Sequence, residues 1–173
     1  QSIETSTPPI RGSGSLVENL RTDSIYDQIG NLIATIDPVG IITRTYYDEA
    51  GRPKTIVQNL VGQDISVVIP PTYNAAFPDQ NIRTDMGYDA NGNVITSIDT
   101  IGVITRTYYD KVNRPVTVVQ NLVGQDINVT TPPSRGNGNQ NIRIDMIYDA
   151  NGNTIATIDP AGVISRTYYD AMN

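Results

Sequence analysis

The chain of 173 residues contains no cysteine, no histidine and no tryptophan. Without cysteine there is no disulfide, no thiol nucleophile and no thiolate zinc site, and without histidine there is no Ser-His-Asp triad. Glutamate, lysine and leucine are scarce too, with three, two and five residues, whereas isoleucine occurs 23 times. Because good helix formers are rare and β-branched residues dominate, the composition predicts an all-β fold.

The charge balance and the lack of long apolar runs exclude two classes of partner. Twelve basic residues against eighteen acidic ones give a formal net charge of −6. An acidic chain is poorly suited to gathering phosphate groups, so we expect no nucleic-acid partner. The apolar runs are far shorter than the roughly 20 residues that a membrane-spanning helix needs, so we expect no membrane insertion.

Internal repetition is the strongest signal in the sequence. Residues 80–113 align without a gap on residues 140–173, with 24 of 34 positions identical, and residues 18–51 follow the same plan. We therefore expect four segments: the end of a preceding module (1–17), module 1 (18–79), module 2 (80–139) and an incomplete module 3 (140–173). Together they predict one continuous array that is a piece of a longer one.

A shorter period lies inside each module and is marked by Tyr-Asp pairs. Their spacings are 21, 41, 21, 39 and 21 residues, so each module is predicted to hold three units of about 20 residues, one without the mark. A fixed period of this size indicates a repeat architecture, in which each unit buries its apolar face against its neighbours. The pairs, taken as the structural motif of the repeat, are Tyr26-Asp27, Tyr47-Asp48, Tyr88-Asp89, Tyr109-Asp110, Tyr148-Asp149 and Tyr169-Asp170.

Alternation and turn residues predict four strands in each module. In module 2, residues 82–88 alternate apolar and polar side chains, and runs 94–99, 103–109 and 116–119 follow. The Asn-Gly pair after the first run is predicted to supply the positive φ angles of a tight turn. The corresponding turn glycines are Gly30, Gly92 and Gly152.

These strands predict an antiparallel strip of hairpins that does not stay flat. An isolated hairpin is marginal in water, and a long open sheet leaves edges that invite aggregation. Winding the strip into a spiral, so that successive turns cover one another, would solve both problems. We therefore predict an antiparallel β-hairpin strip that spirals into a tube or a shell wall.

The acidic residues favour structure over chemistry. The Asp-x-Asn-Gly-Asn turns are superficially similar to a calcium loop, but Gly and Glu do not fall where an EF-hand needs them. We expect each Asp to cap its own turn, with a weak cation shared by Asp27, Asp89 and Asp149 as the alternative. A glycosidase carboxylate pair drawn from Asp37, Asp99 and Asp159 is disfavoured, because these residues recur in every module. We predict no catalytic residue, no metal ligand and no cofactor.

Arginines, tyrosines and loops offer further candidates. Arg44, Arg106 and Arg166 recur in register and could form a ligand-binding row, although covering apolar surface while pairing with an Asp is favoured. The ten tyrosines could stack sugars, although packing in the wall is favoured. Residues 70–78 and 131–139 differ between modules and are the predicted site of any specific contact.

The Tyr-Asp-Ala-Asn-Gly-Asn turn, followed by Gly-Val-Ile-Thr-Arg-Thr-Tyr-Tyr-Asp, resembles the YD repeat of the Rhs (rearrangement hot spot) family. Teneurins and the shell components of insecticidal toxin complexes share this repeat. The motif is matched at 26–47, 88–109 and 148–169. The resemblance implies a β-strip that spirals into a tube or hollow shell, in large proteins that are extracellular or at the cell surface. Some members of the family enclose a toxin carried at their C-terminus. The modules of about 60 residues with a Pro-Pro loop depart from the family pattern, so we do not extend toxin enclosure to this chain.

Together these observations predict a non-enzymatic structural segment of a large extracellular YD-repeat protein, forming a tube, filament or shell wall. Its partner would be neighbouring repeats, in self-assembly. The alternative is an adhesin or binding stalk that contacts carbohydrate or a cell-surface protein through its variable Pro-rich loops.

Overall fold

The computed structural model describes residues 20–170 of the chain. Over these residues it contains eleven β-strands and no helix, and so no helix able to cross a membrane. The predicted all-β class is therefore confirmed. The expected end of a preceding module, residues 1–17, lies outside the described residues.

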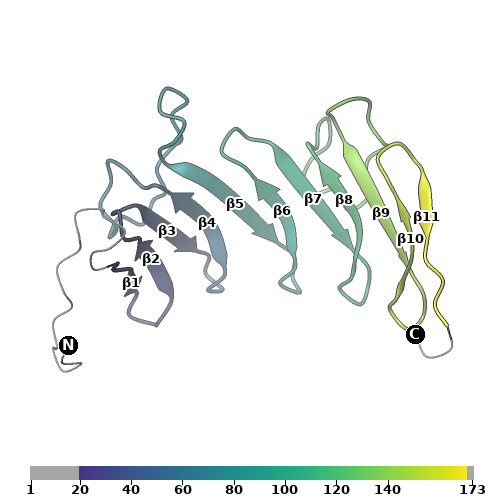
Figure 1. Ribbon diagram of the computed structural model, residues 1–173, viewed down its shortest axis with the longest axis horizontal. Helices are drawn as coiled ribbons and strands as arrows, with labels where there is room; N and C mark the ends of the chain where they lie inside the picture. The colour runs from purple at the N-terminus through teal and green to yellow at the C-terminus, as the bar shows by residue number, and fades with distance from the viewer. Residues whose placement is uncertain (1–19, 171–173) are drawn as a thin grey trace. The chain divides into compact units, whose positions relative to one another are not determined.

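The eleven strands follow one another along the chain (Figure 1). They are β1 (Asp23–Tyr26), β2 (Leu32–Ile36), β3 (Ile42–Tyr47), β4 (Pro53–Gln58), β5 (Ile82–Tyr88), β6 (Val94–Ile98), β7 (Ile104–Tyr109), β8 (Pro115–Gln120), β9 (Ile142–Tyr148), β10 (Thr154–Ile158) and β11 (Ile164–Arg166). The chain forms two compact units, Gln1–Thr84 and Asp85–Asn173, with the boundary inside β5.

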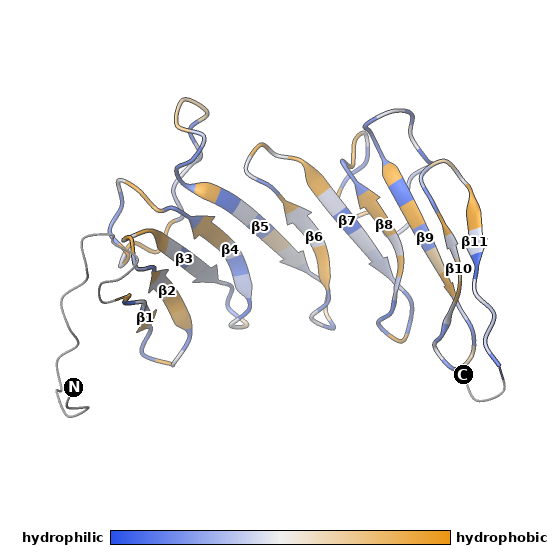
Figure 2. Ribbon diagram, viewed as in Figure 1, coloured by the Kyte–Doolittle hydropathy of each residue, from blue (hydrophilic) through white to orange (hydrophobic). Residues whose placement is uncertain are grey.

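In each unit, every strand pairs antiparallel with the next one in the sequence. In unit 1, β1 to β4 form this meander. In unit 2 the same pairing runs from β5 to β11. Figure 2 shows hydrophobic and hydrophilic residues alternating along β9, which is the period-two pattern of a strand with unlike faces. The predicted antiparallel hairpin strip is thus confirmed.

The hairpin turns differ in one detail from the expectation. The Gly92 N–H donates to the Asp89 carbonyl (3.2 Å), and the Asp89 N–H donates to the Asn93 carbonyl (3.0 Å). Gly92 has a φ of 88°, but Asn91 is not among the residues with positive φ. The turn is therefore a three-residue loop that needs one left-handed residue, not a two-residue turn that needs two. Gly30 and Gly152 hold the same conformation.

A bulge follows each Tyr-Asp turn that opens a module. Gly87 pairs with Thr96 and Tyr88 pairs with Val94, so Ile95 has no partner in the register. Ile33 is skipped in the same way between β1 and β2. A bulged residue leaves its backbone polar groups outside the ladder, and these groups then need another partner.

The buried core lies on one face of each meander, beneath a loop of the same module. In unit 2, Tyr108, Val119 and Leu122 form a buried cluster against which Ile127 packs. Leu122 and Ile127 come from the loop between β8 and β9, and so this loop covers the strands. The loop between β4 and β5 does the same in unit 1, with Leu60 and Ile65 over Tyr46 and Val57.

This covering loop corrects one expectation. The third unit of each module was predicted to be another repeat unit of about 20 residues, but residues 59–81 and 121–141 contain no strand. Within each unit, the chain's own loop covers part of the apolar face, because Leu60 and Leu122 reach back onto the preceding strands.

Candidate functional site

The Tyr-Asp pairs stand where strands end and turns begin. Tyr26, Tyr47, Tyr88, Tyr109 and Tyr148 are the last residues of β1, β3, β5, β7 and β9. Each following Asp opens the turn, and Tyr169-Asp170 lies just beyond β11. The motif therefore marks one structural position, at which alternate strands turn back.

The Asp carboxylate accepts hydrogen bonds from residues of its own turn. Oδ1 of Asp89 accepts the backbone N–H groups of Asn91 and Asn93, each at 2.9 Å, and Oδ2 accepts Nδ2 of Asn93 at 2.8 Å. In the Asp110 turn, Arg114 takes the place of Asn93 and donates from its backbone N–H (3.0 Å) and from Nε (2.8 Å). Since an Asp side chain that accepts these bonds stabilises the turn, the residue acts as a cap.

These hydrogen bonds lower the pKa values of the capping aspartates. The backbone N–H of Arg114, followed by its guanidinium, lowers the pKa of Asp110 below its ordinary value. The side-chain amide of Asn153 and its backbone N–H do the same for the pKa of Asp149. The turns therefore favour the ionised carboxylate, which is the form that accepts the most hydrogen bonds.

The hydroxyl of the second tyrosine in each Tyr-Tyr-Asp ties two strands together. Tyr47 donates to the Leu32 carbonyl (2.8 Å), and Tyr109 donates to the Val94 carbonyl (3.1 Å). Tyr169 makes the same bond to Thr154 (3.1 Å) although it lies beyond β11. In each case the acceptor is the first residue of the preceding strand.

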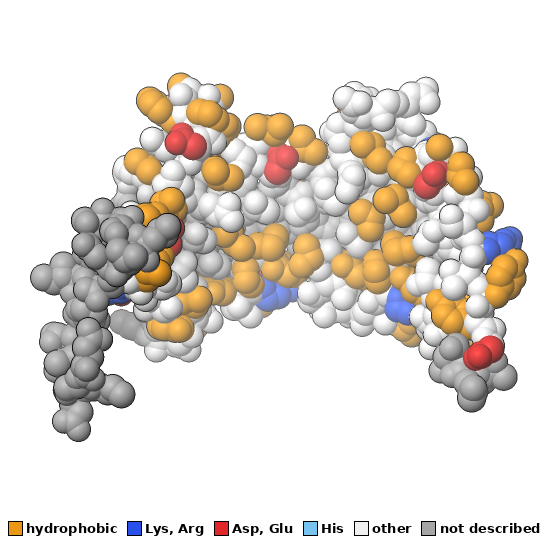
Figure 3. All heavy atoms as spheres, in the orientation of Figure 1, with side chains coloured by type: hydrophobic (Ala, Val, Ile, Leu, Met, Phe, Trp, Pro, Cys, Tyr) orange, Lys and Arg blue, Asp and Glu red, His pale blue; other side chains and the backbone are white. Residues whose placement is uncertain are grey.

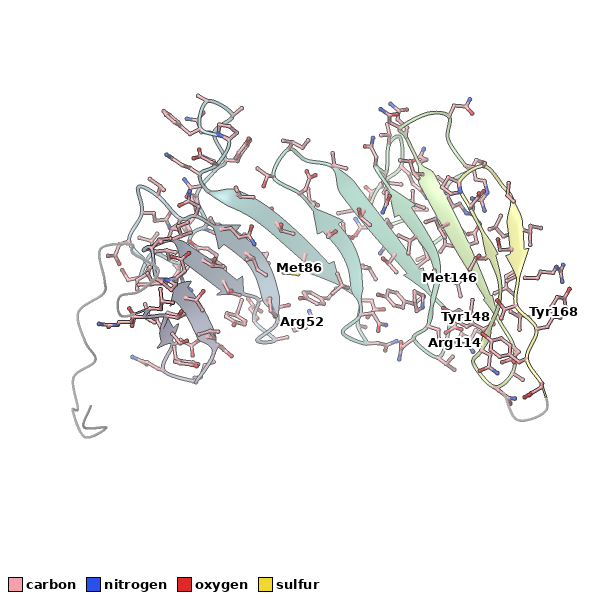
Figure 4. All side chains as sticks on the ribbon, in the orientation of Figure 1. Arg52, Met86, Arg114, Met146, Tyr148 and Tyr168 are labelled. Carbon is pink, nitrogen blue, oxygen red and sulfur yellow. The ribbon has the colours of Figure 1, made fainter. Side chains whose placement is uncertain are left out.

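Tyr148 belongs to a different contact at the end of β9. Its hydroxyl donates to the Pro115 carbonyl at 2.9 Å, and the Arg114 guanidinium lies over its ring, 4.6 Å from the centroid. Figure 4 shows these two side chains next to each other. Because Arg114 also pairs with Asp110 at 2.8 Å, the cap of one turn is linked to the tyrosine of the next motif.

Two of the three recurrent arginines, Arg44 and Arg106, are buried and bind backbone oxygen, whereas Arg166 is exposed. Arg106 is 5% exposed, its Nη1 donates to the Ile95 carbonyl (2.8 Å), and its guanidinium lies over the Tyr108 ring (5.0 Å). Arg44 donates to the Ile33 carbonyl (2.8 Å) in the same manner. The expected pairing with an Asp is therefore wrong: the guanidinium serves the bulged residue. Nε of Arg44 and Nε of Arg106 are buried without a hydrogen-bond partner.

Sequence reasoning missed a second structural element, a pair of asparagines that closes each covering loop. Asn141 donates its backbone N–H to the Asn121 carbonyl (2.9 Å), and its side chain exchanges two hydrogen bonds with the Val123 backbone (2.9 and 3.2 Å). Asn81 makes the same bonds to Asn59 and Val61. We call each pair a clasp. The signal was present, because residues 57–65 and 119–127 are identical.

The other candidates for chemistry are not assembled into a site. Asp37 and Asp99 cap turns as the Tyr-Asp carboxylates do, accepting the N–H groups of Ile41 and Val103 at 2.8 Å. Within residues 20–170, no three acidic side chains lie close enough to hold a metal ion. Tyr46 and Tyr108 are buried, so they offer no face to a sugar. In contrast, Phe77 of the first variable loop is 53% exposed.

Comparison with known proteins gives one family match. Residues 26–59 match the model of the RHS Repeat family. This stretch runs from the first Tyr-Asp tyrosine to the first residue of the clasp in unit 1. No curated protein sequence matches the chain.

The solved structures that the chain matches are of much longer chains, of which it spans about 7%. One is the crystal structure of TcdB2-TccC3-Cdc42 (TM-score 0.38, 23% identity, covering 79% of this chain and 7% of that chain). Another is the Photorhabdus luminescens Tc holotoxin pore (TM-score 0.36, 23% identity, the same coverage). A third is TcdB2-TccC3 without its hypervariable C-terminal region (TM-score 0.37, 22% identity, the same coverage).

The resemblance drawn from the Tyr-Asp motifs is thus confirmed for residues 26–59, which match the RHS Repeat model.

Proposed function

We propose that the chain is a non-enzymatic wall segment of a larger extracellular or cell-surface protein, in which repeats join into a β-strand-rich tube, filament or shell. The observation that carries this proposal is that the motif side chains are occupied in building the sheet. The oxygens of Asp89 and Asp110 cap turns, and the hydroxyl of Tyr109 ties two strands. Side chains in these roles are not available to a substrate.

We also propose that the modules expected from the sequence are the building units of this wall. Each complete module (18–79 and 80–139) carries four strands and most of one covering loop, and the second clasp asparagine, Asn81 or Asn141, stands at the start of the next module. Such a unit brings most of its own core with it. An array of these units can therefore lengthen by adding modules without requiring a new core.

Electron microscopy of the purified chain, together with sedimentation at rising concentration, tests the wall. We expect uniform tubes or filaments, because a sheet with open edges lengthens by adding strands. Dispersed particles of one size at every concentration would contradict self-assembly.

A binding stalk is the second candidate, and the exposed Phe77 in the loop between β4 and β5 favours it. Carbohydrate or a cell-surface protein would then contact this loop and its counterpart in module 2. Binding on a glycan array that is lost in Phe77→Ala would support this candidate. Val39→Ala is the matched control, since Val39 is also exposed but lies in a hairpin turn.

A further inference from the structure

The two faces of the sheet in unit 2 differ in charge. Paired residues of neighbouring strands share a face, as do residues two apart in one strand, so the register assigns each side chain to a face. The face away from the covering loop, which we call the open face, carries Met86, Ser97, Thr105, Thr107, Val118, Ile144, Met146, Thr157 and Ser165. None of these residues is charged. The charged residues paired within the described strands of unit 2 all lie on the covered face, and they are Asp85, Arg106, Arg143, Asp145 and Arg166.

This distribution reverses the usual one, in which an antiparallel sheet turns its apolar face to the core and its polar face to water. Asp145 is only 9% exposed, and its carboxylate accepts Oγ1 of Thr117 (2.7 Å), Nε of Arg143 (2.8 Å) and the guanidinium of Arg135 from the covering loop. Among the described strand residues of unit 2, every buried side chain lies on the covered face. The ion pairs are thus inside and the uncharged side chains outside.

The centre of the open face is apolar. Val118 pairs with Ile144, and Met146 lies two residues further along β9 on the same side. Figure 3 shows one side of unit 2, with hydrophobic side chains over the middle of its strands. Arg114 lies in the turn before β8, and Asp110 neutralises it at 2.8 Å. A continuous, half-exposed apolar patch with a polar border is typical of an interaction site.

We propose that the open face of unit 2 packs against the open face of a second copy of this chain, related to the first by a two-fold axis. Such a contact uses the same patch twice, so the patch must be complementary to itself. The chain has a net charge of −6, and like-charge repulsion therefore opposes most contacts between two copies. The open face avoids this repulsion, and its burial takes no ion out of water. The two sheets would lie about 10 Å apart, with their side chains interdigitated.

The area of the open face fits this occupant. At a strand spacing of about 4.8 Å and a rise of about 3.4 Å per residue, the strand residues of unit 2 from β5 to β10 cover about 550 Å². Two such faces bury about 1,100 Å², which is near the lower limit for a specific interface. The pair is therefore reversible, with an expected dissociation constant of about 10 µM. This inference goes beyond the proposed wall role, which concerns the edges of the sheet.

Oxidation of Met146 by hydrogen peroxide, read by mass spectrometry, tests the pairing in the unaltered chain. Met146 is half-buried on the open face, and its sulfur must be reached by peroxide to form the sulfoxide. By mass action, we expect oxidation to be about fivefold slower at about 500 µM chain than at about 1 µM. Met86, on the same face, should follow (Figure 4). Sedimentation equilibrium should show a dimer over the same range.

Lysine substitutions on the open face give the second test. Val118→Lys places a charge at the centre of the contact, and we expect the dissociation constant of the pair to rise at least about a hundredfold. Thr107→Lys, directly opposite Val118 in the register, should act in the same way. Ile101→Lys is the matched control, because Ile101 is 75% exposed in a turn and should leave the dimer unchanged. Circular dichroism identifies the variants that fold. A dimer of undiminished affinity in the folded lysine variants would overturn the proposal.

The remaining outcomes separate this pairing from the wall role and from another occupant. Large assemblies in which Met146 oxidises equally fast at every concentration would overturn the pairing and leave the wall role intact. A dimer that grows no further would support the pairing and contradict lengthening at the edges. Protection of Met146 by an added reduced and alkylated protein, with none from a second copy, would assign the face to an unfolded polypeptide and overturn the proposal.

Discussion

The guanidinium of Arg106 donates to the carbonyl of Ile95, the one residue that the register between β5 and β6 skips. Arg44 and Ile33 form the same pair in the first repeat. The bulge and the buried arginine thus depend on each other, because a bulged carbonyl in the core requires a donor and a buried guanidinium requires acceptors. The Arg in Ile-Thr-Arg-Thr-Tyr-Tyr-Asp is therefore a structural residue.

Replacing Arg106 tests this pairing. In Arg106→Met, the apolar stem remains but the Ile95 carbonyl loses its donor, and we expect the free energy of unfolding to fall by about 1–3 kcal/mol. Arg166→Met is the control: Arg166 is exposed, so its replacement should change stability by less than about 0.5 kcal/mol. Urea unfolding followed by circular dichroism measures both. Equal effects of the two substitutions would refute the role given to Arg106.

The turn glycines give a second prediction. Gly92 has a φ of 88°, and an added Cβ would meet nothing within 4 Å. Gly92→Ala should therefore destabilise by about 1 kcal/mol through backbone strain alone. Gly87 has no positive φ, and its added Cβ would make only an ordinary contact with Thr96 at 3.5 Å, so Gly87→Ala should be neutral or stabilising. Thermal unfolding of both variants checks this difference, which would vanish if left-handed geometry were unimportant.

The clasp gives a third prediction. Asn141 combines a left-handed φ of 47° with two side-chain bonds to the Val123 backbone. Asn141→Ala loses both features, and we expect a loss of about 2 kcal/mol. Asn139→Ala is the control, since the Asn139 carbonyl, which accepts from Asn121, is retained in the variant. Opening of the covering loop should appear first as faster proteolysis between residues 123 and 139. Unchanged cleavage in Asn141→Ala would contradict the role given to the clasp.

Acidity gives a fourth prediction. The backbone N–H of Arg52, followed by its side chain, lowers the pKa of Asp48 in the folded chain. A carboxyl whose pKa is lowered by folding stabilises the fold at a pH above its unfolded pKa, and that contribution is lost as pH falls through the folded pKa. We therefore expect stability to be constant near neutrality and to decline below about pH 4.

Two variants assign this decline to the caps. Asp48→Asn should lower stability at pH 7 and show a smaller decline in acid than the parent chain, because one linked proton is removed. Glu49→Gln makes the same charge change at the neighbouring exposed position and should follow the parent curve. Unfolding by urea at pH 7 and pH 3 measures the difference. Parallel curves for all three proteins would rule out the Asp48 cap as a source of pH dependence.

The sequence predicted the strands because local chemistry determines them. Alternation over residues 82–88 and the turn glycine Gly92 place β5 and its hairpin correctly, and the other three runs fall within one residue of β6, β7 and β8. These features depend on neighbours a few residues away, so a single sequence contains them.

The covering loops and the arginine contacts were not predictable in the same way. Leu60 and Leu122 look like ordinary strand residues, and only the fold shows that they reach back onto Tyr46 and Tyr108. The acceptor of Arg106 lies eleven residues away, at a bulge that cannot be predicted from the types of the residues that form it. Such contacts depend on register, which one-dimensional periodicity does not fix.

The clasps have a practical consequence. Asn59 and Asn81 enclose two residues more than Asn121 and Asn141, yet both pairs close with the same 2.9 Å backbone bond. The strands on either side have the same lengths in both repeats. The loop between the two asparagines can therefore change in length and composition without changing the flanking strands. A foreign peptide grafted between residues 72 and 78 should therefore leave the clasp and its flanking strands intact, which makes this loop a site for displaying an added epitope.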